Sequence, residues 1–268
     1  DDNTAPDQGA QTLEVNGVMR EYLLDVPGDA SSSEAMPLLF NFHGLGGTAQ
    51  QQLADSQLDR LAAREGFILV TPQAICGTWN VTGFPISSDA DDFGFVSALL
   101  DELASEYNID MNRVYATGMS QGGFLAFDLA CNFSDIFAAI APVAGAMTPP
   151  LQQGCTPLRP IPILQTHGTA DDQIDYAIAE AAIQWWVDFN GTAQAPDVPA
   201  LPDVFPGNGQ TVDRLTYANA ATGVPVEHLR INGGAHVWPG SDGDSDINMA
   251  EEIWSFLRRF GLDGPVSD

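Results

Sequence analysis

Short apolar segments recur along the chain without the polar alternation that a strand with one face in water would show. They include PLLFNF at 37–42, FILVT at 67–71 and FAAIAPV at 137–143. Strands that are apolar on both faces are typical of parallel sheets covered by helices on both sides. Segments with helical character separate these runs, so the sequence predicts an α/β fold with a mostly parallel central sheet.

The other expected elements complete this pattern. An N-terminal hairpin over 12–26 would turn at Asn16-Gly17, because Asn-Gly suits a two-residue turn. Further strands are expected over 113–117, 161–166 and 226–231, and helices over 51–65, 91–107, 120–131, 176–190 and 249–260.

The 268 residues fit one domain, 1–268. Residues 1–10 and 263–268 are expected to be tails, and 191–213, rich in Pro, Gly and Ala, a surface loop. Asp91 and Asp92 would lie in the first turn of their helix, where the helix dipole favours acidic groups. The chain begins at Asp1 without a methionine, which suggests a mature chain whose leader has been removed or left out.

A single serine lies among glycines in GMSQG, residues 118–122, between the strand expected at 113–117 and the helix that follows. A sharp strand-to-helix turn would expose Ser120 above the helix N-terminus, and neighbouring side chains would collide there, which explains the glycines. Backbone N–H groups at a helix N-terminus can stabilise an anion. The sequence therefore predicts Ser120 as a nucleophile rather than part of a plain tight turn.

A serine hydroxyl needs a base to take its proton, and the chain has four histidines. In this arrangement the partners follow in the order Ser, acid, His, which leaves His228 and His236. His228 lies inside an expected strand, whereas His236 lies in the glycine-rich loop GGAHVWPG beyond it. We expect His236 to be the base, and His43 and His167 to be structural.

The acid that orients the imidazole should lie between Ser120 and His236 in sequence. HGTADDQIDY follows the strand at 161–166 and contains three aspartates. Asp171 is the first of them and is the expected acid, whereas Asp172 would be solvated or a cap. Asp175 is expected to cap the helix that follows.

An acyl-transfer intermediate also needs N–H donors for its oxyanion. The expected donors are the backbone amides of Gln121, which follows the nucleophile, and of Leu45 in HGLGG, which follows the strand at 37–42.

The charge of the chain bears on its partners. Thirty-six acidic residues against nine arginines give a net charge of −27, with no lysine. Such a surface repels nucleic acid and anionic membranes, so neither is expected as a partner. It would suit a salty medium, where screening weakens the repulsion between like charges. The alternative is that the chain is an ordinary acidic extracellular protein. We expect a monomer or weak dimer.

No cofactor or metal is expected. The acidic loop SDGDSD, 241–246, lacks the glycine and glutamate that an EF-hand loop needs. Three cysteines cannot all pair within one chain, and one disulfide plus one thiol fits an exported protein.

The chain resembles secreted α/β-hydrolase esterases grouped around polyhydroxybutyrate depolymerases and bacterial feruloyl or acetylxylan esterases. The matching stretches run in the expected order from about residue 10 to 262: HGLGGTAQ, TWN, DDFGFVSALLDELASEYNIDMNRVYATGMSQGG, FAAIAPVAG, HGTADDQIDY, GGAHVWPG and INMAEEIWSFLRRF. The resemblance implies the α/β-hydrolase fold and the same triad, Ser120, Asp171 and His236. It also implies a Cys131–Cys155 disulfide. Because other cysteines of the family are missing here, Cys76 is expected to be a buried, unpaired thiol.

The candidate substrate-binding residues are Trp79, after the strand at 67–71, and Trp238, which would brace the histidine loop. Trp79 would be a stacking surface for an acyl group or, equally, a core residue. Loops 79–92 and 191–213 are expected to shape the pocket.

The expected function is a secreted serine carboxylesterase acting on feruloyl- or acetyl-type plant polysaccharide esters or on small aryl esters. A polyester depolymerase and a non-catalytic binding protein on a hydrolase scaffold are the alternatives.

Overall fold

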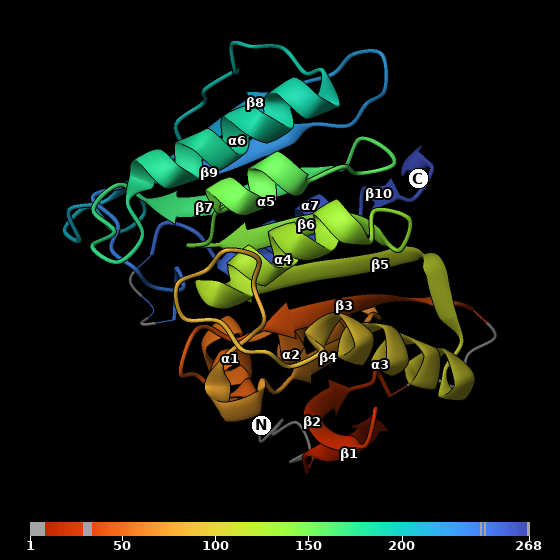
Figure 1. Cartoon of the computed structure of the whole chain (residues 1–268). Coiled ribbons are helices and arrows are strands. Elements are labelled where there is room, and N and C mark those ends of the chain that lie inside the picture. Colours follow the sequence, from red (N-terminus) through yellow and green to blue (C-terminus); the bar gives the residue numbers. More distant parts are fainter. Residues whose placement is uncertain (1–8, 29–33, 242, 244, 267–268) are drawn as a thin grey trace.

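A nine-stranded sheet forms the centre of the protein, in the order β1-β2-β4-β3-β5-β6-β7-β9-β8 (Figure 1). The structure is a computed structural model that describes residues 9–28, 34–241, 243 and 245–266. The strands from β4 to β9 in this order pair in parallel, whereas β1, β2 and β8 pair antiparallel at the two edges. The predicted parallel sheet is therefore confirmed.

The strands of the sheet are β1 Gln11–Val15, β2 Val18–Asp25, β3 Met36–Phe42, β4 Ile68–Pro72, β5 Ile109–Met119, β6 Phe137–Val143, β7 Ile163–Gly168, β8 Thr211–Tyr217 and β9 Val226–Asn232. The helices are α1 Ala49–Ser56, α2 Leu58–Glu65, α3 Asp92–Glu106, α4 Gln121–Asn132, α5 Pro149–Gly154, α6 Tyr176–Asn190 and α7 Met249–Leu257, with a 3₁₀ turn η1 at Ile75–Gly77. A small separate hairpin joins β10 Phe260–Gly261 to β11 Gly264–Pro265.

Helices cover both faces of the sheet and bury a separate apolar layer on each. Helices α3 to α6 lie in front of the sheet in Figure 1, and α7 lies behind it. Neighbouring strand residues point to opposite layers: Phe40 belongs to the layer that contains residues of α3, α4 and α6, whereas Leu39 belongs to the layer that contains residues of α2 and α7. This two-sided burial explains why the central strands carry apolar residues without alternation.

Several expected boundaries were wrong. The helix predicted over 51–65 is two helices, because Gln57 adopts a left-handed conformation with φ of 54° between α1 and α2. The last helix ends at Leu257, and the expected tail 263–268 contributes β11 to the small hairpin. Strand β8 begins inside the expected surface loop 191–213.

Parts of other predictions lie outside the described residues: 1–8 and 267–268 of the expected tails, and Asp242 and Asp244 of the acidic loop. Within the ranges that the structure describes, no helix has both the length and the apolar character needed to cross a bilayer.

The cysteines confirm one expectation and correct another. Cys131, near the end of α4, is bonded to Cys155, which follows α5, and both are buried. Cys76, expected to be a buried thiol, is exposed. It lies on the short 3₁₀ turn η1 with φ of 51°, and this single turn leaves its side chain outside the core.

Removal of the disulfide should destabilise the protein. The bond spans 24 residues, and closure of such a loop in the unfolded chain contributes about 3 kcal/mol. The double variant Cys131→Ser/Cys155→Ser is expected to lose roughly that much unfolding free energy in urea titrations, whereas Cys76→Ser should match the wild type. An unchanged denaturation midpoint in the double variant would contradict this account.

Candidate active site

Ser120 lies at the sharp turn between β5 and α4. Its φ of 52° and ψ of −118° place it outside the ordinary helix and strand regions. Its backbone N–H donates to the carbonyl of Val143 in the neighbouring strand β6 at 2.9 Å, which holds the turn against the sheet. A non-glycine residue at positive φ is strained, and such strain is typical of a nucleophile at a strand-to-helix turn.

The glycines on either side of Ser120 are needed for close packing. A Cβ on Gly118 would lie 2.7 Å from the Gly122 carbonyl carbon and from the Phe42 carbonyl oxygen. A Cβ on Gly122 would collide with the same carbonyl of Phe42. The turn can therefore approach β3 only without side chains at these two positions, as the sequence predicted.

Asp171 and His236 come together at the same end of the sheet. Asp171 follows β7 and His236 follows β9, and these two strands are parallel neighbours. His236 Nδ1 lies 2.7 Å from Asp171 Oδ2, and the two side chains are 7% and 0% exposed. Because a carboxylate can only accept, Nδ1 carries the proton and Nε2 is left as the basic nitrogen.

The Asp171 carboxylate is held on both oxygens. The backbone N–H groups of Gln173 and Ile174 each donate to Oδ1 at 2.9 Å. Burial raises the pKa of Asp171, but the hydrogen bonds from Ile174, His236 and Gln173 outweigh it, so its pKa is lowered overall. Asp172 is exposed, and Asp175 caps α6 by accepting from the Ala177 N–H, as expected.

Ser120 and His236 line one cavity of about 670 Å³. The structure therefore brings Ser120, Asp171 and His236 to one site: His236 contacts Asp171 on one side and shares the cavity with Ser120 on the other. The lining residues carry no charged side chain other than a histidine that can be protonated. The apolar part of the wall consists of Leu45, Phe84, Pro85, Ile86, Met119, Phe124, Pro149, Ile174 and Ile178.

Only one of the two loops expected to shape the pocket does so. Residues 83–86 line the cavity, whereas none of residues 191–213, all of which the structure describes, takes part. That segment instead runs beside the edge strand β8, with bridges at Asp197 and Ala200.

The expected oxyanion donors flank the serine. Gln121 is the first residue of α4, and Leu45 lines the cavity. Gly44 lies against the nucleophile, since a Cβ there would be 3.3 Å from Ser120 Cβ. Gly46, two residues after Gly44, donates its N–H to the carbonyl of Gly77 at 2.7 Å, which fixes the path of the chain beside Ser120.

His43 and His228 have structural contacts, as expected. His43 Nδ1 lies 2.7 Å from the carbonyl of Gly44, and its Nε2 accepts from the Ala74 N–H at 3.1 Å. Burial lowers the pKa of His43, partly offset by the Gly44 hydrogen bond. His228 is buried between the Tyr176 hydroxyl and the carbonyl of Gln165.

Neither candidate substrate-binding tryptophan lines the cavity. Trp79 is fully buried, donates through Nε1 to the carbonyl of His43 at 2.8 Å and packs edge-on against Phe42. Of the two expected roles, Trp79 therefore has that of a core residue, because its ring has no face available for stacking. Trp238 is also buried and lines neighbouring hollows under the histidine loop.

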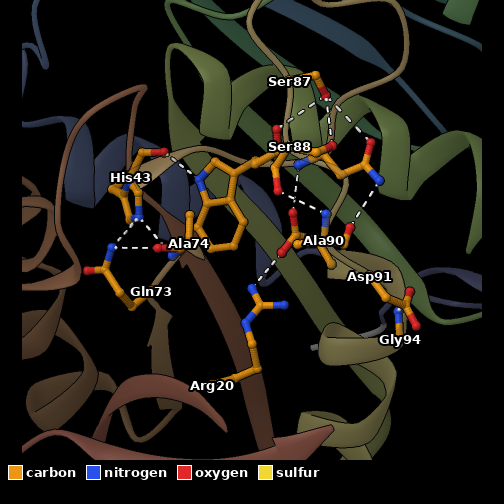
Figure 2. Close-up of polar contacts among 12 residues, drawn as sticks. Arg20, His43, Gln73, Ala74, Ser87, Ser88, Ala90, Asp91 and Gly94 are labelled. Carbon is orange, nitrogen blue, oxygen red and sulfur yellow. Dashed lines mark hydrogen bonds and ion pairs between the residues drawn. The ribbon is translucent and has the colours of Figure 1, made fainter. Parts of the chain in front are cut away.

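The loop over residues 79–91 is held by buried polar side chains, which the sequence did not reveal. Asp92 accepts from the Asn80 N–H at 2.6 Å and from Arg20 at 2.5 Å (Figure 2). Asp92 lies in the first turn of α3, as expected, and strand β2 also brings Arg20 against it. Burial raises the pKa of Asp92, opposed by the bonds from Asn80 and Arg20.

Gln121 holds the same loop from the nucleophile side. Its side-chain carbonyl accepts from the Trp79 N–H at 3.0 Å, and its amide donates to the Ile86 carbonyl at 2.7 Å. Asp128 accepts from the Thr82 N–H at 2.8 Å, and burial raises the pKa of Asp128 to about 6 despite that bond. Both residues lie on α4, so the helix behind Ser120 also positions the cavity wall. Nothing in the sequence pattern around Gln121 indicated this contact.

Comparisons with known proteins point to esterases. The family described as "Esterase PHB depolymerase" matches residues 20–151. The chain is 32% identical to a bifunctional acetylxylan esterase/xylanase of Neocallimastix patriciarum over 86% of its length, and 30% identical to feruloyl esterase B of Piromyces equi over 91%. It spans only 32% and 46% of the lengths of these two proteins. It is also 31% identical to a protein of Nocardia uniformis subsp. tsuyamanensis named as the esterase NocK, covering 86% of this chain and 74% of that protein.

Solved structures share the architecture. An acetyl xylan esterase from Aspergillus awamori superposes with a TM-score of 0.67 at 16% identity, covering 92% of this chain and 99% of that one. A thermostable esterase superposes with a TM-score of 0.64 at 19% identity, covering 94% and 62%. At this level of identity the likeness shows a shared fold, and the α/β-hydrolase fold implied by the sequence resemblance is confirmed.

Proposed function

The chain belongs to the esterase family of the polyhydroxybutyrate depolymerases and feruloyl esterases, and from this membership we propose that it is a serine carboxylesterase. The observation that carries the proposal is the geometry at the end of the sheet. Ser120 stands at a strained turn on the wall of a cavity, and that cavity also holds His236, which is bonded to Asp171. A nucleophile, a base and the acid that orients the base are the three groups that ester hydrolysis by a serine requires.

In the first half of the reaction, Ser120 Oγ attacks the ester carbonyl while His236 Nε2 takes its proton. The oxyanion of the tetrahedral intermediate accepts hydrogen bonds from the backbone amides of Leu45 and Gln121. Asp171 stabilises the imidazolium through Nδ1–H. The intermediate then collapses, the C–O bond to the alcohol breaks, and His236 returns the proton to the departing alkoxide oxygen.

In the second half, water attacks the acyl-Ser120 ester while His236 again takes the proton. Collapse of the second tetrahedral intermediate releases the carboxylic acid, and the proton returns to Ser120 Oγ. No metal or other cofactor enters these steps.

The cavity favours an apolar acyl group. Its walls from Phe84, Ile86 and Phe124 offer apolar contact, and its volume of about 670 Å³ exceeds what an acetyl group fills. An aromatic acyl group of the feruloyl type on a plant polysaccharide, or a small aryl ester, fits this wall. A polyester is the second candidate, favoured by the exposed side chains of Leu45 and Ile86 at the rim, which are 40% and 58% accessible.

A substrate panel tests the proposal. Purified protein is expected to hydrolyse p-nitrophenyl acetate and methyl ferulate, with kcat/KM for the aromatic acyl group about 10-fold or more above that for methyl acetate, because an apolar wall rewards apolar area. Acetylated xylan and polyhydroxybutyrate complete the panel. Absence of hydrolysis of every ester would support the non-catalytic alternative, and polyhydroxybutyrate as the preferred substrate would support the polyester alternative.

We infer that the protein acts outside the cell. The Cys131–Cys155 disulfide is typical of oxidising compartments, and the net charge of −27 favours solubility in a salty medium. Ester substrates are its expected partners, and gel filtration tests the expected monomer or weak dimer.

A further inference from the structure

His167 lies beneath the acid of the proposed triad with its side chain fully buried. It belongs to β7, the strand that delivers Asp171. His167 Nε2 lies 2.9 Å from the carbonyl of Ile174, which can only accept, so Nε2 carries the proton. Nδ1 is then the acceptor for the side-chain amide of Gln165 at 3.2 Å, and that amide also donates to the carbonyl of Gly145. The two hydrogen bonds of the ring nitrogens agree with one neutral tautomer.

The backbone of Ile174 connects this histidine to the acid. Its carbonyl accepts from His167, and its N–H donates to Asp171 Oδ1 at 2.9 Å. His167 Nε2 also lies 3.1 Å from Asp171 Oδ2, the oxygen that accepts from His236. This N–H group therefore closes the turn over 171–174 through the Ile174 carbonyl, and its nitrogen lies beside the carboxylate.

The groups around His167 do not change charge in the range where an esterase is assayed. Burial lowers the pKa of His167, offset in part by Ile174 and Asp171. Burial lowers the pKa of His228 on β9 to about 3, and burial followed by Glu180 raises the pKa of Tyr176 on α6 to about 12. Arg230, which acts on both of these groups, stays charged in its ion pair with Asp213. These groups therefore contribute no change of charge near neutral pH.

We propose that His167 is a positioning residue for the acid: its Nε2–H holds the turn over 171–174 and the Asp171 carboxylate in the geometry that orients His236. This inference rests on the proposed esterase function. It assigns a role in the reaction to a histidine that the sequence suggested was only structural.

The role predicts a shift in pH dependence that simple packing would not produce. Without the N–H near Oδ2, the Asp171 carboxylate loses part of the positive potential around it, and more of its negative potential acts on His236. The imidazolium form of His236 is then favoured over the free base. Because the free base is the active form, the acid limb of kcat/KM should move to higher pH.

Three substitutions at His167 distinguish the effect of the Nε2–H donor from the effect of the packed ring. His167→Leu removes the donor, whereas His167→Gln places an amide N–H at the same number of bonds from Cα as Nε2. The amide of His167→Asn ends near the place of Nδ1 and does not reach Ile174. We expect the leucine and asparagine variants to move the acid limb of p-nitrophenyl acetate hydrolysis upward by about 0.5 to 1 pH unit and to lower kcat about 10-fold. The glutamine variant should keep most of the wild-type kcat, and its acid limb should lie close to that of the wild type.

A second measurement does not depend on activity. With four histidines in the chain, the ring C–H signals of ¹³C-labelled protein can be followed by NMR against pH, and the His236 signal is identified by its loss in His236→Ala. Its titration midpoint should move upward in the leucine or asparagine variant and return toward the wild type in the glutamine variant.

The outcomes are distinct. An inactive wild-type protein would contradict the proposed function. The NMR titration would still test whether His167 acts on the Asp171–His236 pair. Folded leucine or asparagine variants with wild-type midpoints, or a glutamine variant shifted as far as the others, overturn the positioning role. If the leucine variant does not fold, the comparison of asparagine with glutamine decides alone.

Discussion

Replacement of Ser120 by alanine is expected to reduce ester hydrolysis by about 10⁴- to 10⁶-fold, because the attacking oxygen is removed. The residual rate would come from the oxyanion donors and the substrate pocket alone. Stability should be nearly unchanged: the Ser120 hydroxyl makes no capping hydrogen bond with α4, and its backbone N–H bond to Val143 does not involve the side chain.

The measurement is kcat/KM on p-nitrophenyl acetate together with a thermal melt. Ser105→Ala, an exposed serine on α3, is the matched control and should behave as the wild type. Retention of more than about a tenth of the wild-type activity in Ser120→Ala would exclude this serine as the nucleophile, since removal of a nucleophile costs several orders of magnitude.

Asp171→Asn is expected to be nearly as damaging, with a loss of about 10⁴-fold in kcat. Asp171 Oδ1 accepts two backbone N–H groups, so the amide oxygen of asparagine must take that place. The NH₂ group then faces His236 Nδ1, which must give up its proton to accept from it. The proton moves to Nε2, and His236 can no longer act as the base toward Ser120.

Asp172→Asn is the matched control, since the neighbouring carboxylate is exposed and its loss should leave kcat close to the wild-type value. If Asp172→Asn were the inactive variant and Asp171→Asn the mild one, the assignment of the acid would be wrong. The lowered pKa of Asp171 also predicts that its carboxylate stays ionised under all ordinary assay conditions. Protonation of this group should therefore not limit the rate near neutral pH.

The parts of the site that the sequence predicted share one property: each lies shortly after the end of a strand. Ser120 follows β5, Asp171 follows β7 and His236 lies beyond β9. The carboxyl ends of parallel strands meet at one edge of a sheet, so the strand order alone brings these residues near each other. Local patterns also located the helices that end at glycine or begin at a capping residue, such as α6 with Asp175.

The parts that were missed depend on contacts between distant segments. Trp79 was expected at a rim or in the core, and only the path of the loop over α4 determines that it is buried. The partner of Asp92 is Arg20, 72 positions earlier in the chain. Cys76 was expected to be a buried, unpaired thiol because other cysteines of the family are missing here, but a single turn of 3₁₀ helix leaves its side chain outside the core.

The way in which the loop over 79–91 is held has a consequence for changing substrate preference. Gln121, Asp92, Asp128 and Thr148 bind backbone groups of Trp79, Asn80, Thr82 and Ile86 rather than their side chains. The hydrogen bonds that hold the loop thus do not use the side chains at 84–86, three positions that line the cavity, although Phe84 also packs against Phe124. The side chains at 84–86 can therefore be varied in laboratory evolution to select new acyl preferences. The hydrogen bonds that hold the loop beside the serine are left in place.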